Sequence, residues 1–131
     1  MADKLTFELV SPERLLLSAQ VDMVVVPGTE GEFGILAAHA PLVSSLRPGV
    51  IAVHDEKNLR RIFVRGGFAE VTAAGLTVLA EEAIDLADLD RAGLEARIKD
   101  AEEDVSDAKS DAARASAQAQ LDSLRALQTS L

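Results

Sequence analysis

The sequence contains no cysteine, tryptophan or tyrosine, and aromatic residues make up only 3% of its 131 positions. Without cysteine, disulfide bonds, thiolate nucleophiles and cysteine-ligated zinc are excluded. The shortage of aromatic rings leaves few surfaces on which bases or sugars could stack. The formal net charge of −9 opposes binding to nucleic acid or to an anionic lipid surface. We therefore expect no nucleic-acid partner and no zinc or thiol chemistry.

Long hydrophobic runs are also absent. Wholly apolar stretches such as Met23–Val26 reach only four residues, whereas a membrane-spanning helix needs about 20. The N-terminus runs straight into alternating sequence and lacks the apolar segment of a signal peptide. We therefore expect no direct insertion into a membrane, and a cytoplasmic location by default.

Hydrophobic residues make up 48% of the sequence, enough for an aliphatic core, and the pattern changes character near Ile84. Before that point, short apolar stretches alternate with turn signals, and Leu5, Phe7 and Leu9 show the alternation of a half-buried strand. About nine short strands at this spacing indicate a β-sandwich or flattened barrel over residues 1–84. Further strands are expected at Met23–Val26, Gly49–His54, Leu59–Arg65, Phe68–Thr72 and Leu76–Leu79.

Residues 85–131 have helical periodicity. Asp85, Asp88 or Asp90 can cap the start of a first helix, and Ser110 or Asp111 the start of a second. Two helices joined by a short connection predict an antiparallel helical hairpin with a thin, alanine-rich apolar seam. The expected stripes are Leu94, Ile98, Ala101, Val105 and Ala108 on the first helix, and Ala113, Ala117, Leu121, Leu124 and Leu131 on the second.

Residues 26–42 form the densest motif, VPGTEGEFGILAAHAPL, with two carboxylates and a histidine among three glycines and two prolines. Glycines that permit positive φ, and prolines that end strand pairing on each side, predict a stiff loop that presents Glu30 and Glu32 to a partner. Together with His39 these carboxylates could also hold a divalent metal. Their spacing matches no familiar ligand motif, so a structural turn or a partner contact is the favoured interpretation.

Arg65-Gly66-Gly67-Phe68 is a second dense motif between two strand-like runs. A glycine pair in this context indicates a tight turn or bulge. The motif lacks the longer phosphate-loop pattern and its Lys-Ser/Thr, which argues against nucleotide binding here. No serine stands in a nucleophile-elbow context, so no catalytic constellation is predicted.

Both motifs resemble the epsilon subunit of bacterial F-type ATP synthases. The similar segments are GTEGEFGIL, HAPL, VRGGFAEV and LTVLA, and a strand-rich part followed by a helical hairpin is similar to the family's two-part architecture. The resemblance implies a non-catalytic rotor subunit of the central stalk that couples proton flow to ATP synthesis. It implies the gamma subunit and the c-ring as partners, and a peripheral position on the cytoplasmic face of the bacterial inner membrane.

The resemblance also implies roles for particular residues. Glu30, Gly31 and Glu32, with nearby His39, would form the contact with the c-ring. In some family members the hairpin binds ATP or blocks hydrolysis by contacting the alpha and beta catalytic subunits. The matching positions here are Asp88 and Arg91 for ATP, in a motif that lacks its leading aliphatic residue, and Arg114 and Arg125 for inhibition. With only two arginines on the last helix, we expect weak or absent self-inhibition.

Two other interpretations remain. The first is a small regulatory protein whose hairpin senses ATP, with ATP as a weak ligand and no resident cofactor. For Asp88 and Arg91, a helix cap and a local ion pair are the favoured interpretation over ATP binding. The second is a metal-dependent enzyme on a jelly-roll-like sandwich, which requires a bound metal ion.

Overall fold

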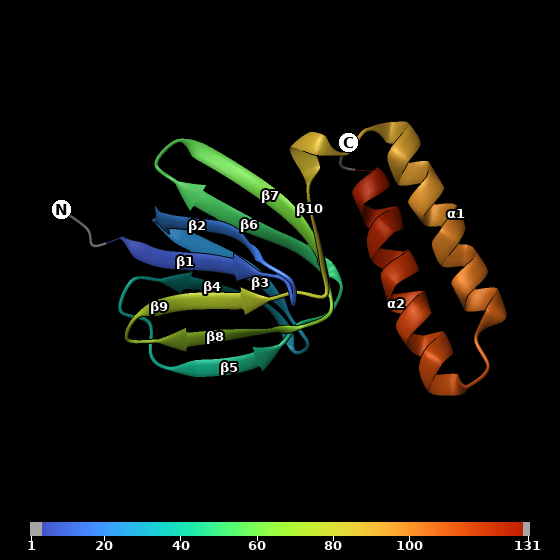
Figure 1. Cartoon of the computed structure of the whole chain (residues 1–131), viewed down its shortest axis with the longest axis horizontal. Coiled ribbons are helices and arrows are strands. Elements are labelled where there is room, and N and C mark those ends of the chain that lie inside the picture. The colour runs from blue at the N-terminus through green and yellow to red at the C-terminus, as the bar shows by residue number, and fades with distance from the viewer. Residues whose placement is uncertain (1–3, 130–131) are drawn as a thin grey trace. The chain divides into compact units, whose positions relative to one another are not determined.

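The computed structural model describes residues 4–129 of the protein. These residues fall into two compact units, one ending at Leu86 and the other beginning at Ala87. Within the described residues, the first unit contains ten strands and the second contains two α-helices (Figure 1). The predicted class, a β-sandwich followed by a helical hairpin, is confirmed.

The ten strands form two five-stranded sheets. Sheet A has the order β2-β1-β9-β8-β5, and sheet B has the order β10-β7-β6-β3-β4. Neighbouring strands are antiparallel except for the parallel pair β1 and β9. The strands are β1 Leu5–Val10, β2 Leu15–Val21, β3 Met23–Gly28, β4 Gly31–Leu36, β5 Leu42–Ser45, β6 Gly49–Asp55, β7 Asn58–Arg65, β8 Phe68–Thr72, β9 Gly75–Leu79 and β10 Glu82–Asp85.

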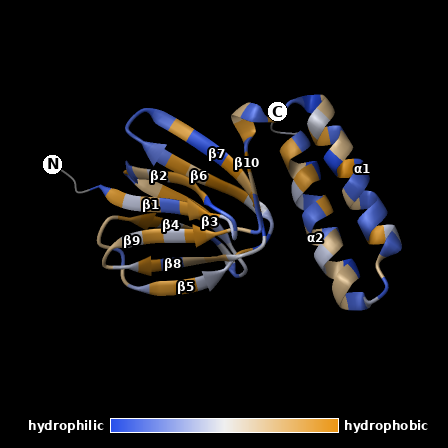
Figure 2. Ribbon diagram, viewed as in Figure 1, coloured by the Kyte–Doolittle hydropathy of each residue, from blue (hydrophilic) through white to orange (hydrophobic). Residues whose placement is uncertain are grey.

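The core of the sandwich follows from the period-two alternation of its strands. In β1, Leu5, Phe7 and Leu9 are buried while the residues between them are partly exposed, and Figure 2 shows the same alternation as changing colour along the strand. Complete burial of a side chain of this size contributes about 1.5–3 kcal/mol. Across from these residues, Val24, Ile35, Ile51, Ile62 and Val64 of sheet B complete the same aliphatic cluster.

The prediction that Pro27 ends strand pairing is wrong, because β3 continues to Gly28 and Pro27 pairs with Glu32 of β4. The pairing between β3 and β6 extends only to Val25, so the missing N–H of Pro27 removes no hydrogen bond to β6. The Pro27 carbonyl instead accepts a hydrogen bond from the backbone N–H of Arg47 at 3.0 Å. The predicted loop is therefore a tight β-hairpin.

The prediction of a turn at the glycine pair is confirmed. Gly66 and Gly67 have φ values of 65° and 105°, and they connect β7 of sheet B to β8 of sheet A. A Cβ atom on Gly67 would lie 1.8 Å from the carbonyl oxygen of Leu79. Glycine is thus required here both by the backbone conformation and by the close approach of another strand.

The second unit contains the predicted hairpin. A short 3₁₀-helix, η1 (Leu86–Asp88), precedes α1 (Arg91–Asp107) and α2 (Asp111–Gln128). Of the three predicted caps, Asp90 caps α1 by accepting a hydrogen bond from the Gly93 N–H at 2.6 Å. Ser110 caps α2 in the same way through the Ala113 N–H at 3.0 Å. Neither described helix has the length and apolarity that crossing a membrane requires.

The predicted apolar stripes are partly confirmed. Leu94, Ile98 and Ala101 of α1 are buried, whereas Val105 is half-buried and Ala108 lies beyond the helix as its C-cap residue. In α2 the buried residues are Leu121, Leu124 and Leu127. The predicted stripe omitted Leu127, included Ala113, which is exposed, and included Leu131, which lies outside the described residues.

Candidate functional site

Glu30 lies at the tip of the β3–β4 hairpin. Gly28 pairs with Gly31, which leaves only Thr29 and Glu30 in the turn, and both are exposed. Of the three glycines for which positive φ was predicted, only Gly31 has it, at 129°. The Thr29 N–H donates to the Ser45 carbonyl at 3.1 Å, which attaches the turn to the end of β5. This anchoring makes the turn a rigid support for an exposed carboxylate.

Glu32 is exposed on β4, two residues beyond Glu30. The adjacent backbone is closely packed, because a Cβ atom on Gly28 would lie 2.7 Å from the ring of Phe33. Glu30, Gly31 and Glu32 together form what we call the acidic tip. The structure thus brings together two of the three predicted side chains.

His39 does not belong to the acidic tip. It follows the far end of β4, a six-residue strand that covers about 20 Å at 3.3 Å per residue. Its backbone N–H donates to the Leu36 carbonyl at 3.2 Å, and its Nδ1 lies 2.7 Å from the Ala40 carbonyl. The expectation that His39 lies near Glu30 is therefore wrong, because an extended strand separates residues that are close in sequence.

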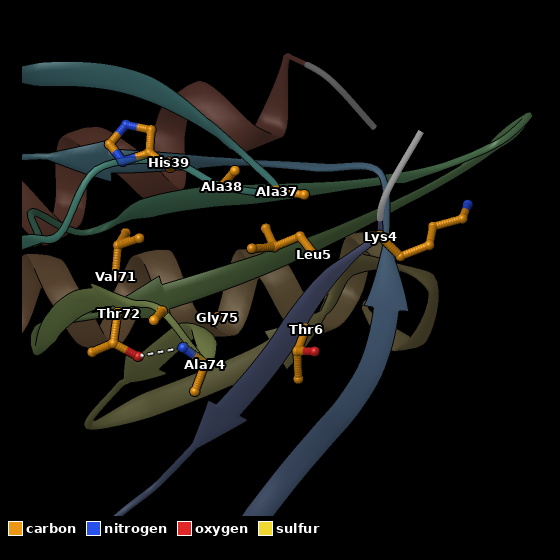
Figure 3. A pocket seen from close by; sticks show the side chains of 11 residues that line it. Lys4, Leu5, Thr6, Ala37, Ala38, His39, Val71, Thr72, Ala74 and Gly75 are labelled. Carbon is orange, nitrogen blue, oxygen red and sulfur yellow. Dashed lines mark hydrogen bonds between the residues drawn. The ribbon is translucent and has the colours of Figure 1, made fainter. Parts of the chain in front are cut away.

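Because His39 is separated from Glu30 and Glu32, the three side chains do not form the candidate metal site. Within residues 4–129, no group of three or more histidine, aspartate or glutamate side chains is arranged to hold a metal ion. A shallow cavity of about 140 Å³ lies beside His39, between the start of β1 and the β8–β9 turn. Its lining is mainly small or aliphatic, and Figure 3 shows the Lys4 side chain pointing away from it.

A group of exposed apolar side chains near His39 was not anticipated from the sequence. Leu36, Leu42 and Val43 have relative exposures of 57%, 38% and 64%. They lie on β4 and β5, which are the edge strands of sheets B and A. We call Leu36, Leu42 and Val43 the apolar edge, a name for three exposed side chains on edge strands and not for one continuous patch, because the consecutive residues Leu42 and Val43 point to opposite faces of β5. Consecutive apolar residues such as Leu42 and Val43 were the available signal, since they point to opposite faces of a strand and both remain exposed on the edge strand β5.

The candidate residues for ATP binding lie at the start of the second unit. Asp88 is in η1 and Arg91 is the first residue of α1, and both are exposed. Asp90, between them, supplies the helix cap. Among the described residues, no ion pair joins Asp88 to Arg91, so the predicted local pair does not form.

The two arginines of α2 are engaged within the hairpin. Arg114 donates to Oδ1 of Asp111 at 3.4 Å and to the Ala108 carbonyl at 3.3 Å. Arg125 forms an ion pair with Glu102 of α1 at 3.7 Å. Both side chains remain about half exposed. A partner would therefore have to compete with these contacts for each guanidinium group.

Comparison with known proteins assigns the family. Residues 4–86 match the family model of the beta-sandwich domain of the ATP synthase delta/epsilon chain, and residues 90–129 match that of the C-terminal domain of the ATP synthase epsilon chain. The protein belongs to the ATP synthase epsilon chain family. The expectation drawn from the two glycine-containing motifs is thereby confirmed.

Relatives agree with this assignment, and a solved structure shares the fold. The sequence is 62% identical to the ATP synthase epsilon chain of Parvibaculum lavamentivorans, over 97% of both proteins. It is 56% identical to that of Maricaulis maris, over 98% of this protein and 96% of the relative. One subunit in the Euglena gracilis mitochondrial ATP synthase shares its fold, with a TM-score of 0.78 and 24% identity, over 99% of this protein and 82% of that subunit.

Proposed function

We propose that this protein is the non-catalytic epsilon subunit of a proton-translocating F-type ATP synthase, where it joins the gamma subunit to the c-ring in the central stalk. One observation carries the division of labour: the β3–β4 turn presents two exposed carboxylates, whereas the edge strands β4 and β5 carry exposed apolar side chains. A rotor subunit that must hold two partners needs two such surfaces. The bacterial relatives support a peripheral location on the cytoplasmic face of the inner membrane.

The acidic tip is the proposed contact with the c-ring. Glu30 stands on a turn held by the bond between Thr29 and Ser45, so its position is fixed before any partner arrives. An exposed ion pair with a basic loop residue contributes only about 0–1 kcal/mol. The tip therefore serves to orient the contact, and most of the binding free energy must come from another surface.

The apolar edge is the proposed contact with the gamma subunit. Leu36, Leu42 and Val43 are exposed on strands that each have a free edge. Burial of apolar surface yields about 25 cal/mol per Å², and the unpaired backbone of an edge strand can also accept a partner. Burial of these side chains by a partner can therefore supply affinity that the acidic tip lacks.

Reassembly of the complex tests the gamma contact. Val43→Asp places a charge in the apolar edge and should weaken binding to the gamma-containing core by about tenfold or more, equivalent to at least 1.4 kcal/mol. Leu15→Asp is the matched control, because Leu15 is also exposed, at 54%, but lies on β2 at the opposite edge of sheet A. Equal binding by Val43→Asp and the unmodified protein would refute the assignment.

A charge reversal tests the c-ring contact. Glu30→Lys should leave binding to the gamma-containing core unchanged while it lowers ATP-driven proton pumping relative to ATP hydrolysis. Glu103→Lys makes the same change of charge at an exposed position of α1 and should alter neither quantity. Full pumping by the Glu30→Lys complex would show that the acidic tip is not needed for coupling.

A second function, ATP binding by the hairpin, is favoured by one observation. Because Asp90 caps α1, the exposed side chains of Asp88 and Arg91 are left available for a ligand. Isothermal titration of the full-length protein with ATP should give a weak binding heat that Asp88→Ala and Arg91→Ala abolish. Asp100→Ala, at an exposed site on α1, should preserve it. Binding that survives both substitutions would exclude this site.

A further inference from the structure

The apolar seam between α1 and α2 occupies only one half of the hairpin. The buried side chains of α1 lie within residues 94–101, and those of α2 lie within residues 121–127. We call these two segments the packed half and residues 102–120 the connection half. No side chain of the connection half is buried, and residues 111–116 are all exposed. The half that joins the two helices is therefore the half with the least tertiary support.

Side-chain composition adds to this difference. The packed half contains four leucines and an isoleucine among its buried residues. The apolar residues of the connection half are alanines and Val105, and Figure 2 shows the alanines in a paler orange than the leucines. Because burial free energy scales with apolar area, the connection half gains little from helix pairing.

Polar contacts do not compensate for the weak packing. Those of Ser110, Arg114 and Gln118 are local: the Ser110 cap, the bonds of Arg114 to Asp111 and Ala108, and a bond from Gln118 to Asp122 on the same helix. The ion pair of Arg125 with Glu102 crosses between the helices, but it lies at the border of the two halves and both side chains are about half exposed. Exposed pairs of this kind contribute little to stability.

We propose that the hairpin opens in two stages, with the connection half opening first while the packed half stays closed. Short helices are only marginally stable in water without tertiary packing, and weakly packed segments open at lower free energy than the whole unit. The division is a property of the hairpin itself, whether or not the hairpin binds ATP or affects hydrolysis. It would make the helix connection the first part of the unit accessible to a partner.

Amide hydrogen exchange of the full-length protein, followed by NMR, tests this proposal. Protection factors for residues 103–107 and 115–120 should be at least about tenfold lower than those for residues 98–101 and 124–127, as expected for separate opening units. The comparison is limited to interior amides of each helix, because the first N–H groups of a helix have no intrahelical acceptor and exchange rapidly whatever the packing. A ratio below this value would overturn the proposal.

Two substitutions distinguish local from cooperative opening. Val105→Ala should accelerate exchange only in the connection half, because Val105 is the largest half-buried apolar residue there. Leu124→Ala, which removes a side chain only 1% exposed, should accelerate exchange in both halves. Glu103→Ala, at an exposed neighbouring site, is the control and should change neither. If Val105→Ala accelerates both halves equally, the hairpin opens as one unit and the proposal fails.

Discussion

At the residue scale, Lys4 joins three segments of the sandwich. Its Nζ atom donates to Oδ1 of Asp22 and to Oδ1 of Asp55, each at 2.7 Å. Asp22 also accepts a hydrogen bond from the backbone N–H of Glu56. The Lys4 ammonium, followed by that N–H, lowers the pKa of Asp22, and the two carboxylates raise the pKa of Lys4 above its ordinary value. This cluster ties the start of β1 to the β2–β3 corner and the β6–β7 turn.

The cluster predicts a pH-dependent contribution to stability. Because the folded-state pKa of Asp22 is lowered, its contribution is complete above the unfolded-state value and is lost as pH falls through the folded-state value. Asp22→Asn should therefore lower the melting temperature at neutral pH, and the difference from the unmodified protein should shrink below about pH 4. At the alkaline end, the raised pKa of Lys4 preserves the charge of the ammonium above its usual range. Thermal melts of both proteins from acid to neutral pH measure the difference in melting temperature that Asp22→Asn causes.

Asp55→Asn is the internal control for that prediction. Asp55 accepts from Lys4, whereas Asp22 accepts from both Lys4 and the Glu56 N–H. The loss should thus be smaller for Asp55→Asn, and added salt should reduce both losses because the groups are exposed. Equal losses, or a loss unchanged at acid pH, would contradict the assigned roles.

Gly67 allows a sharper prediction. Gly67→Ala forces a Cβ atom to within 1.8 Å of the Leu79 carbonyl at a φ of 105°. Strain at such a backbone conformation costs about 1–3 kcal/mol, and the clash adds to it. Urea unfolding should show a loss of at least about 3 kcal/mol. Gly34→Ala is the control: its φ is not positive and its nearest contact would be 3.4 Å, so a comparable loss there would exclude a specific role for Gly67.

At the scale of elements, the start of α2 depends on a single side chain. Ser110 accepts a hydrogen bond from the Ala113 N–H, and neither glycine nor proline marks the connection between the helices. Ser110→Ala should destabilise the hairpin by about 1 kcal/mol, as is typical of lost N-caps. Circular dichroism at 222 nm during thermal unfolding measures the effect. Ser116→Ala, at an exposed position inside α2, should not lower stability; a matching loss there would assign the effect to composition instead of capping.

The elements also show which structural features can be predicted from residues that are close in sequence. The alternation of Leu5, Phe7 and Leu9 predicted β1, and the glycine pair predicted its turn, because both signals depend on neighbours along the sequence. The grouping of Glu30 with His39 failed because an extended strand carries residues apart faster than a loop does. The prediction that strand pairing ends at Pro27 failed for a different reason. A proline is tolerated in β3 because β6 no longer pairs with β3 at that position, and the local sequence does not show where that pairing ends.

At the scale of the whole molecule, the distribution of surfaces matters more than any single group. The residues of the apolar edge lie on β4 and β5, which are edge strands of different sheets, and the sequence alone could not show that both strands are edges. The acidic tip was found from sequence because its residues are contiguous. Contacts made by one turn are thus predictable, whereas surfaces made by several strands require the fold.

The described contacts of the hairpin also bear on whether it inhibits ATP hydrolysis. Arg114 interacts with Ala108 and Asp111, and Arg125 with Glu102, so a contact that catalytic subunits make through these two arginines has to compete with these interactions. Ending the protein after Leu86 retains every strand and the buried Leu86 side chain, and removes the second unit. We expect ATP hydrolysis by the membrane complex to change by less than about twofold, which is under 0.5 kcal/mol, and proton pumping to stay coupled. The double substitution Arg114→Ala with Arg125→Ala should behave the same way. A several-fold rise in hydrolysis with both variants would show that the hairpin is an inhibitor acting through these arginines, whereas a rise with the truncation alone would assign inhibition to other residues of the hairpin.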